Sequence, residues 1–151
     1  MQKLILGLLV AAVAAASAYM FASSPLRAGE VMLYKNPQCS CCEEYAEYLR
    51  RNGFAVTVKP THDLAAMSRE AGMTDEFQGC HLAHIDNYVV SGHVPISTIN
   101  KLLKERPAIK GITLPGMPEG SPGMSGTKSQ SFAIYEVGGT GSDKPKVYAV
   151  E

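Results

Sequence analysis

The stretch VMLYKNPQCSCCEEYAEYLRRNG (residues 31–53) places a strand, a turn with three cysteines and a helix in immediate succession. Together with Glu30, the apolar residues at the start of this stretch are typical of a short buried strand at 30–34. Pro37 disfavours helix at the residue before it. Residues 41–53 have an apolar face, glutamates in the first turn, arginines in the last and a closing glycine, which predicts a helix. The cysteines therefore lie where a strand gives way to a helix.

Beyond this stretch the chain continues to alternate between strand and helix patterns. Apolar periodicity and turn-forming residues locate the boundaries of each element. The expected elements are a strand at 54–58 closed by Pro60, a helix from 63 to 72, a hairpin of 82–85 and 88–90 around Asp86-Asn87, a helix at 96–106, and two strands at 131–135 and 146–150 around a turn at 139–144.

The order strand, helix, strand, helix, hairpin, helix is that of a thioredoxin-like (glutaredoxin-like) α/β domain. In such a domain the cysteine turn follows the first strand, and a second loop just before the hairpin packs against it. Cys80 begins that second loop, where most such proteins carry a cis-proline. The topology therefore predicts that Cys80 faces the turn of Cys39, Cys41 and Cys42. The loop at 114–126 and the last two strands form an extra C-terminal part.

The N-terminal segment resembles an export signal rather than part of a fold. Residues 4–18 are apolar or small, and residues 16–18 have the small-x-small pattern of a cleavage site. An uncleaved anchor is the alternative, because apolar residues resume at 19–22 and the run approaches the ~20 residues of a membrane helix. Either way, the rest of the chain would lie outside the cytoplasm, where disulfides form. We expect a signal peptide or anchor at 1–22, a linker at 23–29 and one domain at 30–151.

Charge and composition exclude several classes of function. The 14 lysines and arginines equal the 14 aspartates and glutamates, so no excess charge indicates nucleic acid or an acidic membrane surface. The sequence has no catalytic Ser/His/Asp setting, no phosphate-binding glycine loop and no calcium loop. The part after the linker, about 120 residues, suits one domain with a single core.

The four cysteines are the candidate functional residues. A Cys39–Cys42 bridge would close almost no loop, so it makes a poor structural staple. The helix N-terminus instead favours thiolate over thiol at these positions, and thiolate is the form that binds metal and attacks disulfides.

Three chemistries are open to Cys39, Cys41, Cys42 and Cys80. Two disulfides, Cys39–Cys42 and Cys41–Cys80, are compatible with an even cysteine number. Thiol–disulfide exchange would use Cys39 and Cys42. Zinc would suit one four-thiolate centre, but adjacent Cys41 and Cys42 cannot both easily reach it. Several Cu(I) ions bridged by shared thiolates suit crowded sulfurs better, and four thiolates would balance up to four such ions. We therefore favour copper.

Methionine and histidine supply further candidate ligands. Met117 and Met124 lie in a proline- and glycine-rich loop with no periodicity that would place them in a core, and thioethers bind Cu(I). His81 directly follows Cys80, and His84 lies three residues further on, so both are candidates. In a regular strand His81 would point away from Cys80. We interpret His93 as a helix-entry residue and His62 as a surface residue.

Four motifs, in order, resemble the CopG-like copper-resistance proteins, many of which were catalogued only as a domain of unknown function. They are Cys-x-Cys-Cys after the first strand, Cys-His before the hairpin, Gly-His-Val-Pro opening a helix, and the loop PGMPEGSPGM at 115–124. The resemblance covers about 31–148. One departure is Gly79, where a serine is expected.

The resemblance implies a thioredoxin-like fold, export to the periplasm and a cysteine-bridged multinuclear copper site with a role in copper tolerance. It carries the cluster cysteines onto Cys39, Cys41, Cys42 and Cys80, and the methionine loop onto Met117 and Met124. We predict a periplasmic copper-binding protein that holds or cycles copper at a thiolate cluster; cycling between Cu(I) and Cu(II) would make it a copper-dependent oxidoreductase. The alternatives are a metal-free thiol–disulfide oxidoreductase that uses Cys39 and Cys42, and a module that delivers copper to an exporter. The expected partners are copper ions and other periplasmic copper-handling proteins.

Overall fold

The computed structural model describes residues 29–138 and 145–151. The expected signal segment, all but the last residue of the expected linker and the turn expected at 139–144 lie outside the described residues. Among the residues that are described, no helix has the length and apolar character needed to cross a membrane.

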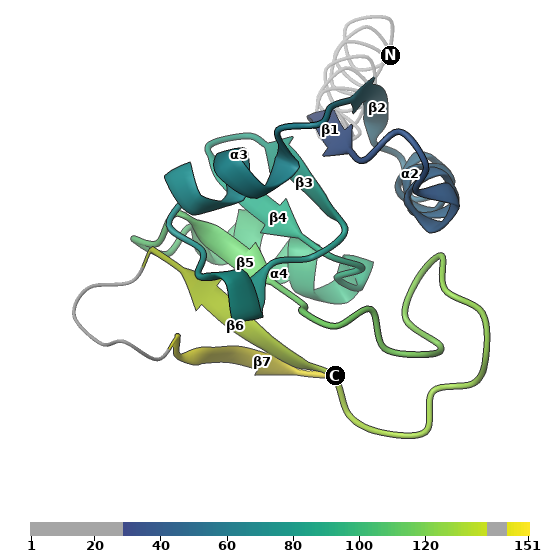
Figure 1. Ribbon diagram of the computed structural model, residues 1–151. Coiled ribbons are helices and arrows are strands. Elements are labelled where there is room, and N and C mark those ends of the chain that lie inside the picture. The colour runs from purple at the N-terminus through teal and green to yellow at the C-terminus, as the bar shows by residue number, and fades with distance from the viewer. Residues whose placement is uncertain (1–28, 139–144) are drawn as a thin grey trace, which may run out of the picture.

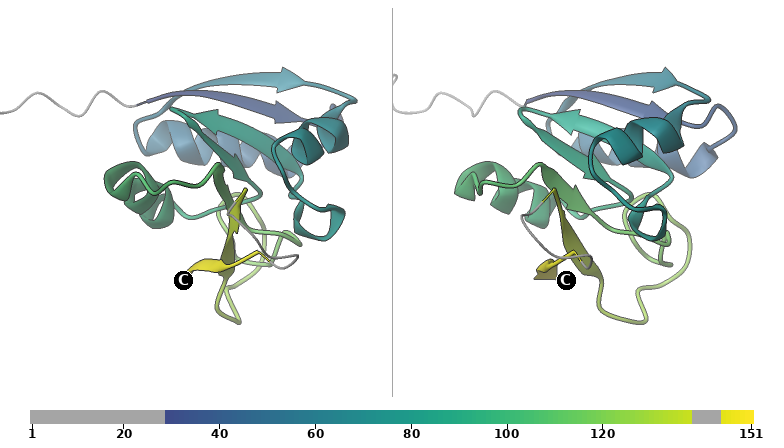
Figure 2. Two further views of the ribbon diagram at one scale, coloured as in Figure 1. Left: turned by 90° about the vertical axis from the view of Figure 1, so that its left-hand side faces the viewer. Right: turned by 60° about the vertical axis from the view of Figure 1, so that its left-hand side comes forward.

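A seven-stranded mixed sheet organises the chain, in the order β2-β1-β3-β4-β5-β6-β7 (Figure 1). The β1–β2 and β4–β5 pairs are parallel, and the remaining neighbours are antiparallel. β1 and β2 therefore lie at one end of the sheet and the C-terminal pair at the other, as Figure 2 shows. The strands are β1 (Glu30–Lys35), β2 (Ala55–Pro60), β3 (His81–Ile85), β4 (Tyr88–Ser91), β5 (Gly111–Thr113), β6 (Ala133–Val137) and β7 (Val147–Val150).

Helices pack on both faces of this sheet. α2 (Ser40–Arg51) and α4 (Ile96–Glu105) contribute Leu49 and Leu102 to the main core. α3 (Leu64–Glu70) contributes to a smaller cluster around Leu82. Leu82 and its neighbour Ala83 belong to different clusters because successive strand residues point to opposite faces. One 3₁₀ turn, η1 (Asp75–Phe77), precedes β3.

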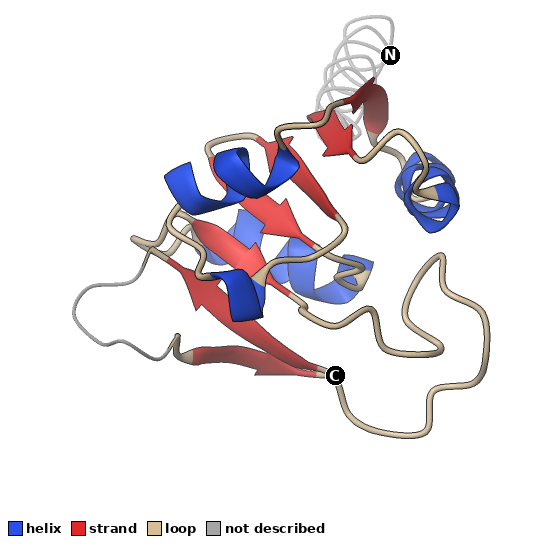
Figure 3. Cartoon of the chain, viewed as in Figure 1, coloured by secondary structure: helices blue, strands red, loops and turns tan. Residues whose placement is uncertain are grey.

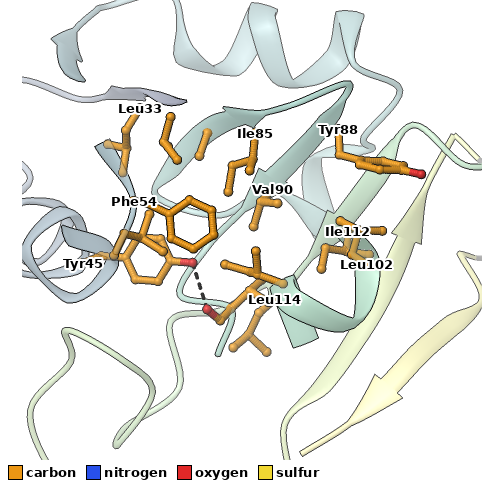
Figure 4. Close-up of a cluster of buried hydrophobic side chains, with 14 of the residues drawn as sticks. Leu33, Tyr45, Phe54, Ile85, Tyr88, Val90, Leu102, Ile112 and Leu114 are labelled. Atoms are coloured by element: carbon orange, nitrogen blue, oxygen red, sulfur yellow. Dashed lines mark hydrogen bonds between the residues drawn. The ribbon is translucent and has the colours of Figure 1, made fainter. Parts of the chain in front are cut away.

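The main core fixes the orientation of α2 relative to the sheet (Figure 4). Tyr45 is fully buried beside Leu33 and Phe54 in this cluster, and its hydroxyl donates a hydrogen bond to the Val94 carbonyl at 2.8 Å. A second hydroxyl, of Tyr48, accepts the Ile96 backbone N–H at 2.9 Å. These two bonds join α2 to the start of α4. They therefore fix the position of α2, whose first turn carries the cysteines, relative to the rest of the core.

The elements predicted from the sequence are present, with shifted boundaries. α2 ends as expected: Gly53 has φ 91° and donates to the Arg50 carbonyl, while Phe54 donates to that of Leu49, which is a Schellman ending. The predicted end of β2 is wrong, since the strand includes Pro60; β2 is a sheet edge, where a missing N–H leaves no ladder bond unmade. β5 was not predicted, because three residues carry too little pattern.

The long connection between β5 and β6 passes the start of α2 and contains the predicted methionine loop (Figure 3). A Cβ at Gly123 would lie 2.7 Å from the Tyr45 backbone nitrogen, and Gly123 has φ 79°. Both facts require glycine, and they show that the loop backbone packs directly on the first turns of α2.

Candidate metal centre

The four cysteines meet in one place, as the topology predicts. Cys39 is the N-cap residue of α2, and Cys80 directly precedes β3. The sulfur of Cys42 lies 3.5 Å from that of Cys80, and the sulfur of Cys41 lies 3.4 Å from that of Cys39. All four sulfurs lie within 4.8 Å of one another. Ligation of metal by these residues remains a prediction.

Two of the four sulfurs are joined in the structure. Cys39 and Cys42 form a disulfide with Cα atoms 5.5 Å apart, whereas Cys41 and Cys80 are free. The expected alternative of two disulfides is therefore wrong for the Cys41–Cys80 pair. Reduction of Cys39–Cys42 would release the remaining two sulfurs as ligands.

Burial governs the protonation of Cys80. It raises the pKa of the Cys80 thiol to about 12, and the neighbouring Cys41 adds to the shift. A buried thiol of this kind keeps its proton near neutral pH until a cation replaces it. Metal binding at Cys80 would thus release a proton.

His81 contributes a buried nitrogen beside Cys80. The side chain is fully buried, its ring stacks on Tyr45 at 4.5 Å between centroids, and its Nδ1 lies 3.5 Å from the Cys80 sulfur. The expectation that His81 points away from Cys80 is wrong, because β3 begins only at His81. Burial, with a smaller effect of His93, lowers the pKa of His81 to about 3. Nε2 is buried without a hydrogen-bond partner among the described residues.

His93 is a site residue that the sequence interpretation missed. Its side chain is fully buried, and its Nε2 lies 3.1 Å from the Cys80 sulfur. Because Nδ1 donates to the Pro122 carbonyl at 2.6 Å, Nε2 carries the lone pair that faces the sulfur. Burial lowers the pKa of His93, so the ring is neutral at pH 7. The sequence interpretation placed His93 at the start of a helix, two residues before Pro95, and so did not count it as a candidate ligand. The Gly-His-Val-Pro motif was the signal that could have identified it.

The other two histidines lie elsewhere. His84 is exposed and meets the edge of the Tyr34 ring at 5.7 Å, away from the sulfurs. His62 is exposed, which confirms the interpretation as a surface residue. Of the histidines, the structure therefore gathers His81 and His93 around Cys80, with all three ligand atoms within 4.8 Å of one another.

The two loop methionines differ in position. Met124 lines a surface hollow of about 480 Å³ together with Cys41 and Glu44. Met117 is 41% exposed, has φ 45°, and is not among the described residues that line this hollow. The structure thus brings Met124 to the cysteines and leaves Met117 at the surface.

Comparison with known proteins agrees with this geometry. Two solved structures of a "copper resistance protein copG", forms 2 and 1, are 32% and 31% identical to the chain, with TM-scores of 0.73 and 0.72. Each alignment covers 82% of this chain and 98% of the other. The chain belongs to the CopG family. A family described as a protein of unknown function, DUF411, also matches at residues 77–124, which include Cys80, both buried histidines and both loop methionines. A search of the curated proteins gives no match.

Membership of the CopG family confirms the resemblance stated from the four motifs. The family's solved members are named for copper resistance, and this chain has a group of cysteines that could hold a metal ion. The same hollow that exposes Cys41 beside Met124 would give such an ion a path from solvent.

Proposed function

We propose that this protein binds copper at a thiolate cluster and thereby limits copper toxicity. The ligands would be Cys39, Cys41, Cys42 and Cys80 in their reduced form. The observation that carries the proposal is the 3.5 Å separation of the Cys42 and Cys80 sulfurs, which joins a turn and a loop 38 residues apart. Met124, His81 and His93 would complete the donor set, and Met117 would act from the rim of the loop.

The donor set fits copper better than other metals. Thiolate and thioether sulfurs select Cu(I), and four sulfurs within 4.8 Å suit ions that share ligands. Four thiolates would balance up to four Cu(I) charges, which favours a multinuclear cluster. Among the described residues, Nε2 of His81 is a buried polar atom without a hydrogen-bond partner, and such atoms in native proteins usually have one.

Bound copper would supply a one-electron couple between Cu(I) and Cu(II). The chain would contribute thiolates that suit Cu(I), and imidazole nitrogens at His81 and His93 that suit either oxidation state. A copper-dependent oxidoreductase is the activity this combination supports. The packing of Tyr45 against His81 and of the loop against α2 would limit the access of water to the cysteine site.

We further propose that the domain is thioredoxin-like and exported to the periplasm. The strand order β2-β1-β3-β4, with parallel β1–β2 and antiparallel β3, supports the fold assignment. The apolar N-terminal segment and the Cys39–Cys42 disulfide support an oxidising location. The partners would be copper ions and other copper-handling proteins of the same compartment.

Anaerobic titration with Cu(I) after reduction of the disulfide tests the copper proposal. We expect saturation at more than one copper per chain, measured by metal analysis of the desalted protein. Saturation at one copper or fewer would exclude a multinuclear cluster. Alkylating all four cysteines before the titration is the control and should abolish binding.

A metal-free thiol–disulfide oxidoreductase is the second candidate, favoured by the Cys39–Cys42 disulfide. It predicts that copper-free, reduced protein reduces the disulfides of insulin at the same rate with and without a chelator. Replacing Cys39 by serine would abolish that reaction. Turnover that requires copper would instead favour the first candidate.

A further inference from the structure

The buried side chain of Lys35 places a positive charge against the backbone of the cysteine turn. Lys35 is the last residue of β1 and shares its buried face with Val31 and Leu33. Its side chain is only 3% exposed. Lysine is almost never buried to this extent without partners, so its surroundings indicate its role.

The Lys35 ammonium group is surrounded by oxygens of the turn that carries Cys39. Nζ donates to the carbonyls of Asn36 and Pro37 at 3.3 Å each and to that of Cys39 at 3.1 Å. The Glu43 carboxylate, from the first turn of α2, lies 3.1 Å away. The cation therefore joins the end of β1, the turn and the helix start around one atom.

The charge of Lys35 is only partly neutralised by these contacts. Three of the partners are neutral carbonyls, and the side chain of Glu43 is 53% exposed, where water screens its charge. A positive charge hydrogen-bonded to the backbone of Cys39 favours negative charge on nearby sulfurs. On Cys39 and Cys42 themselves, negative charge arises only when their disulfide is opened.

We propose that Lys35 is a positioning residue for the cysteine site: it fixes the turn and supplies the positive charge that stabilises the reduced cysteines. In the reaction that opens the site, two glutathione thiols give two electrons to the Cys39–Cys42 bond and release two protons. The sulfur–sulfur bond breaks and glutathione disulfide is released. One proton stays on one cysteine as a thiol and the other passes to solvent, which leaves one thiolate whose charge Lys35 stabilises. The inference rests on the proposed function in one respect, that copper needs these cysteines reduced.

The test is the reduction equilibrium of the copper-free protein in glutathione buffers, read by alkylation of thiols and mass spectrometry. Replacing Lys35 by methionine keeps the apolar stem and removes the charge. We expect the equilibrium constant for reduction to fall about tenfold, which is about 30 mV for a two-electron couple. Lys35→Arg keeps the charge and should recover most of the loss.

Glu43→Gln should shift the equilibrium in the opposite direction, by about threefold, since the remaining counter-charge of Lys35 is removed. Glu47→Gln is the matched control: Glu47 lies on the same helix, is also 53% exposed, and pairs with Arg50 instead of Lys35. It should leave the equilibrium unchanged.

A folded Lys35→Met protein with an unchanged equilibrium would overturn the proposal. If that variant does not fold, the Glu43→Gln and Glu47→Gln pair decides, and equal values for the two would overturn it. Because no copper is present in the assay, failure of the copper proposal leaves this outcome unaffected.

Discussion

β3 carries two histidines, one at its first residue and one at its fourth, and the surroundings of the two differ completely. His81, at the first residue, is fully buried beside Cys80 and has an unpartnered nitrogen. His84, three residues later, is exposed and touches only the edge of Tyr34 among the ring contacts described. The residue type is the same, so the difference lies in burial and in the sulfurs that the fold brings to one end. A histidine of this chain is therefore a candidate copper ligand when it is buried beside the cysteine sulfurs, and its position in the sequence alone does not decide this.

The methionine loop repeats this contrast on a smaller scale. Met124 lines the hollow over Cys41, whereas Met117 is exposed. In sequence both follow a glycine and stand next to a proline-rich segment, and nothing there separates them. Each pair offers a matched experiment, in which replacing one member should change copper binding clearly more than replacing the other.

The largest effect is expected for Cys80→Ser. Removing the sulfur that joins the loop to the turn should reduce the copper bound per chain by at least half, because the remaining cysteines lie on one short segment. The variant should stay folded, since serine fills nearly the same volume. Metal analysis and circular dichroism of the reduced, copper-loaded protein measure both. Full copper loading by the variant would contradict the site.

His93→Ala, compared with His84→Ala, should give the next largest effect. His93 approaches the Cys80 sulfur and anchors the loop through Pro122. Its loss should weaken Cu(I) affinity about tenfold or more, because even residues that only support metal ligands have effects of about this size. His84→Ala should stay within about twofold of the parent affinity. Competition with a colorimetric Cu(I) chelator measures both. Equal losses would show that burial beside Cys80 does not distinguish His93 from His84 as a copper ligand.

Met124→Leu, compared with Met117→Leu, should have a smaller effect. Leucine keeps the apolar volume and removes the thioether. We therefore expect Cu(I) affinity to fall severalfold for Met124, and by no more than about twofold for Met117, which would act only from the exposed rim of the loop. The same chelator competition applies. A loss confined to Met117 would show that the loop binds copper by its exposed tip instead.

The smallest effect is expected far from the cysteines, at Glu151. Hydrogen bonds donated by Ser97 and Thr98 lower the pKa of its carboxyl group. A lowered pKa in the folded state adds stability above the unfolded pKa, and this contribution is lost as pH falls through the folded pKa. At pH 7 the free energy of unfolding of the parent protein should exceed that of Glu151→Gln by less than about 1 kcal/mol, because the carboxylate is near the surface. In urea unfolding this difference should disappear as the pH falls through the lowered pKa of Glu151 and the carboxyl group becomes protonated. Copper binding at pH 7 should be the same for the two proteins. A stability difference that persists once the carboxyl group is protonated would show that the carboxylate charge is not its source.

The sequence was sufficient for the parts of the molecule that depend on periodicity and chain order. The strand–turn–helix around Cys39 and the convergence of Cys80 follow from element order alone, because a hairpin must return its preceding loop to the first strand. His93 could not be placed this way. It contacts the Cys80 sulfur and the Pro122 carbonyl, and the position of Pro122 depends on the fold of the 114–126 loop, which has no period. The same reason hid the difference between Met117 and Met124. The disulfide state depends on redox conditions, which sequence spacing does not set.

X-ray absorption at the copper edge of the reduced, copper-loaded protein tests the central claim most directly. The account predicts sulfur neighbours at about 2.3 Å, the scale of metal–thiolate bonds, together with scattering from a second copper ion. Both signals should decrease in Cys80→Ser. A spectrum with nitrogen or oxygen neighbours and no copper neighbour would contradict a shared thiolate site.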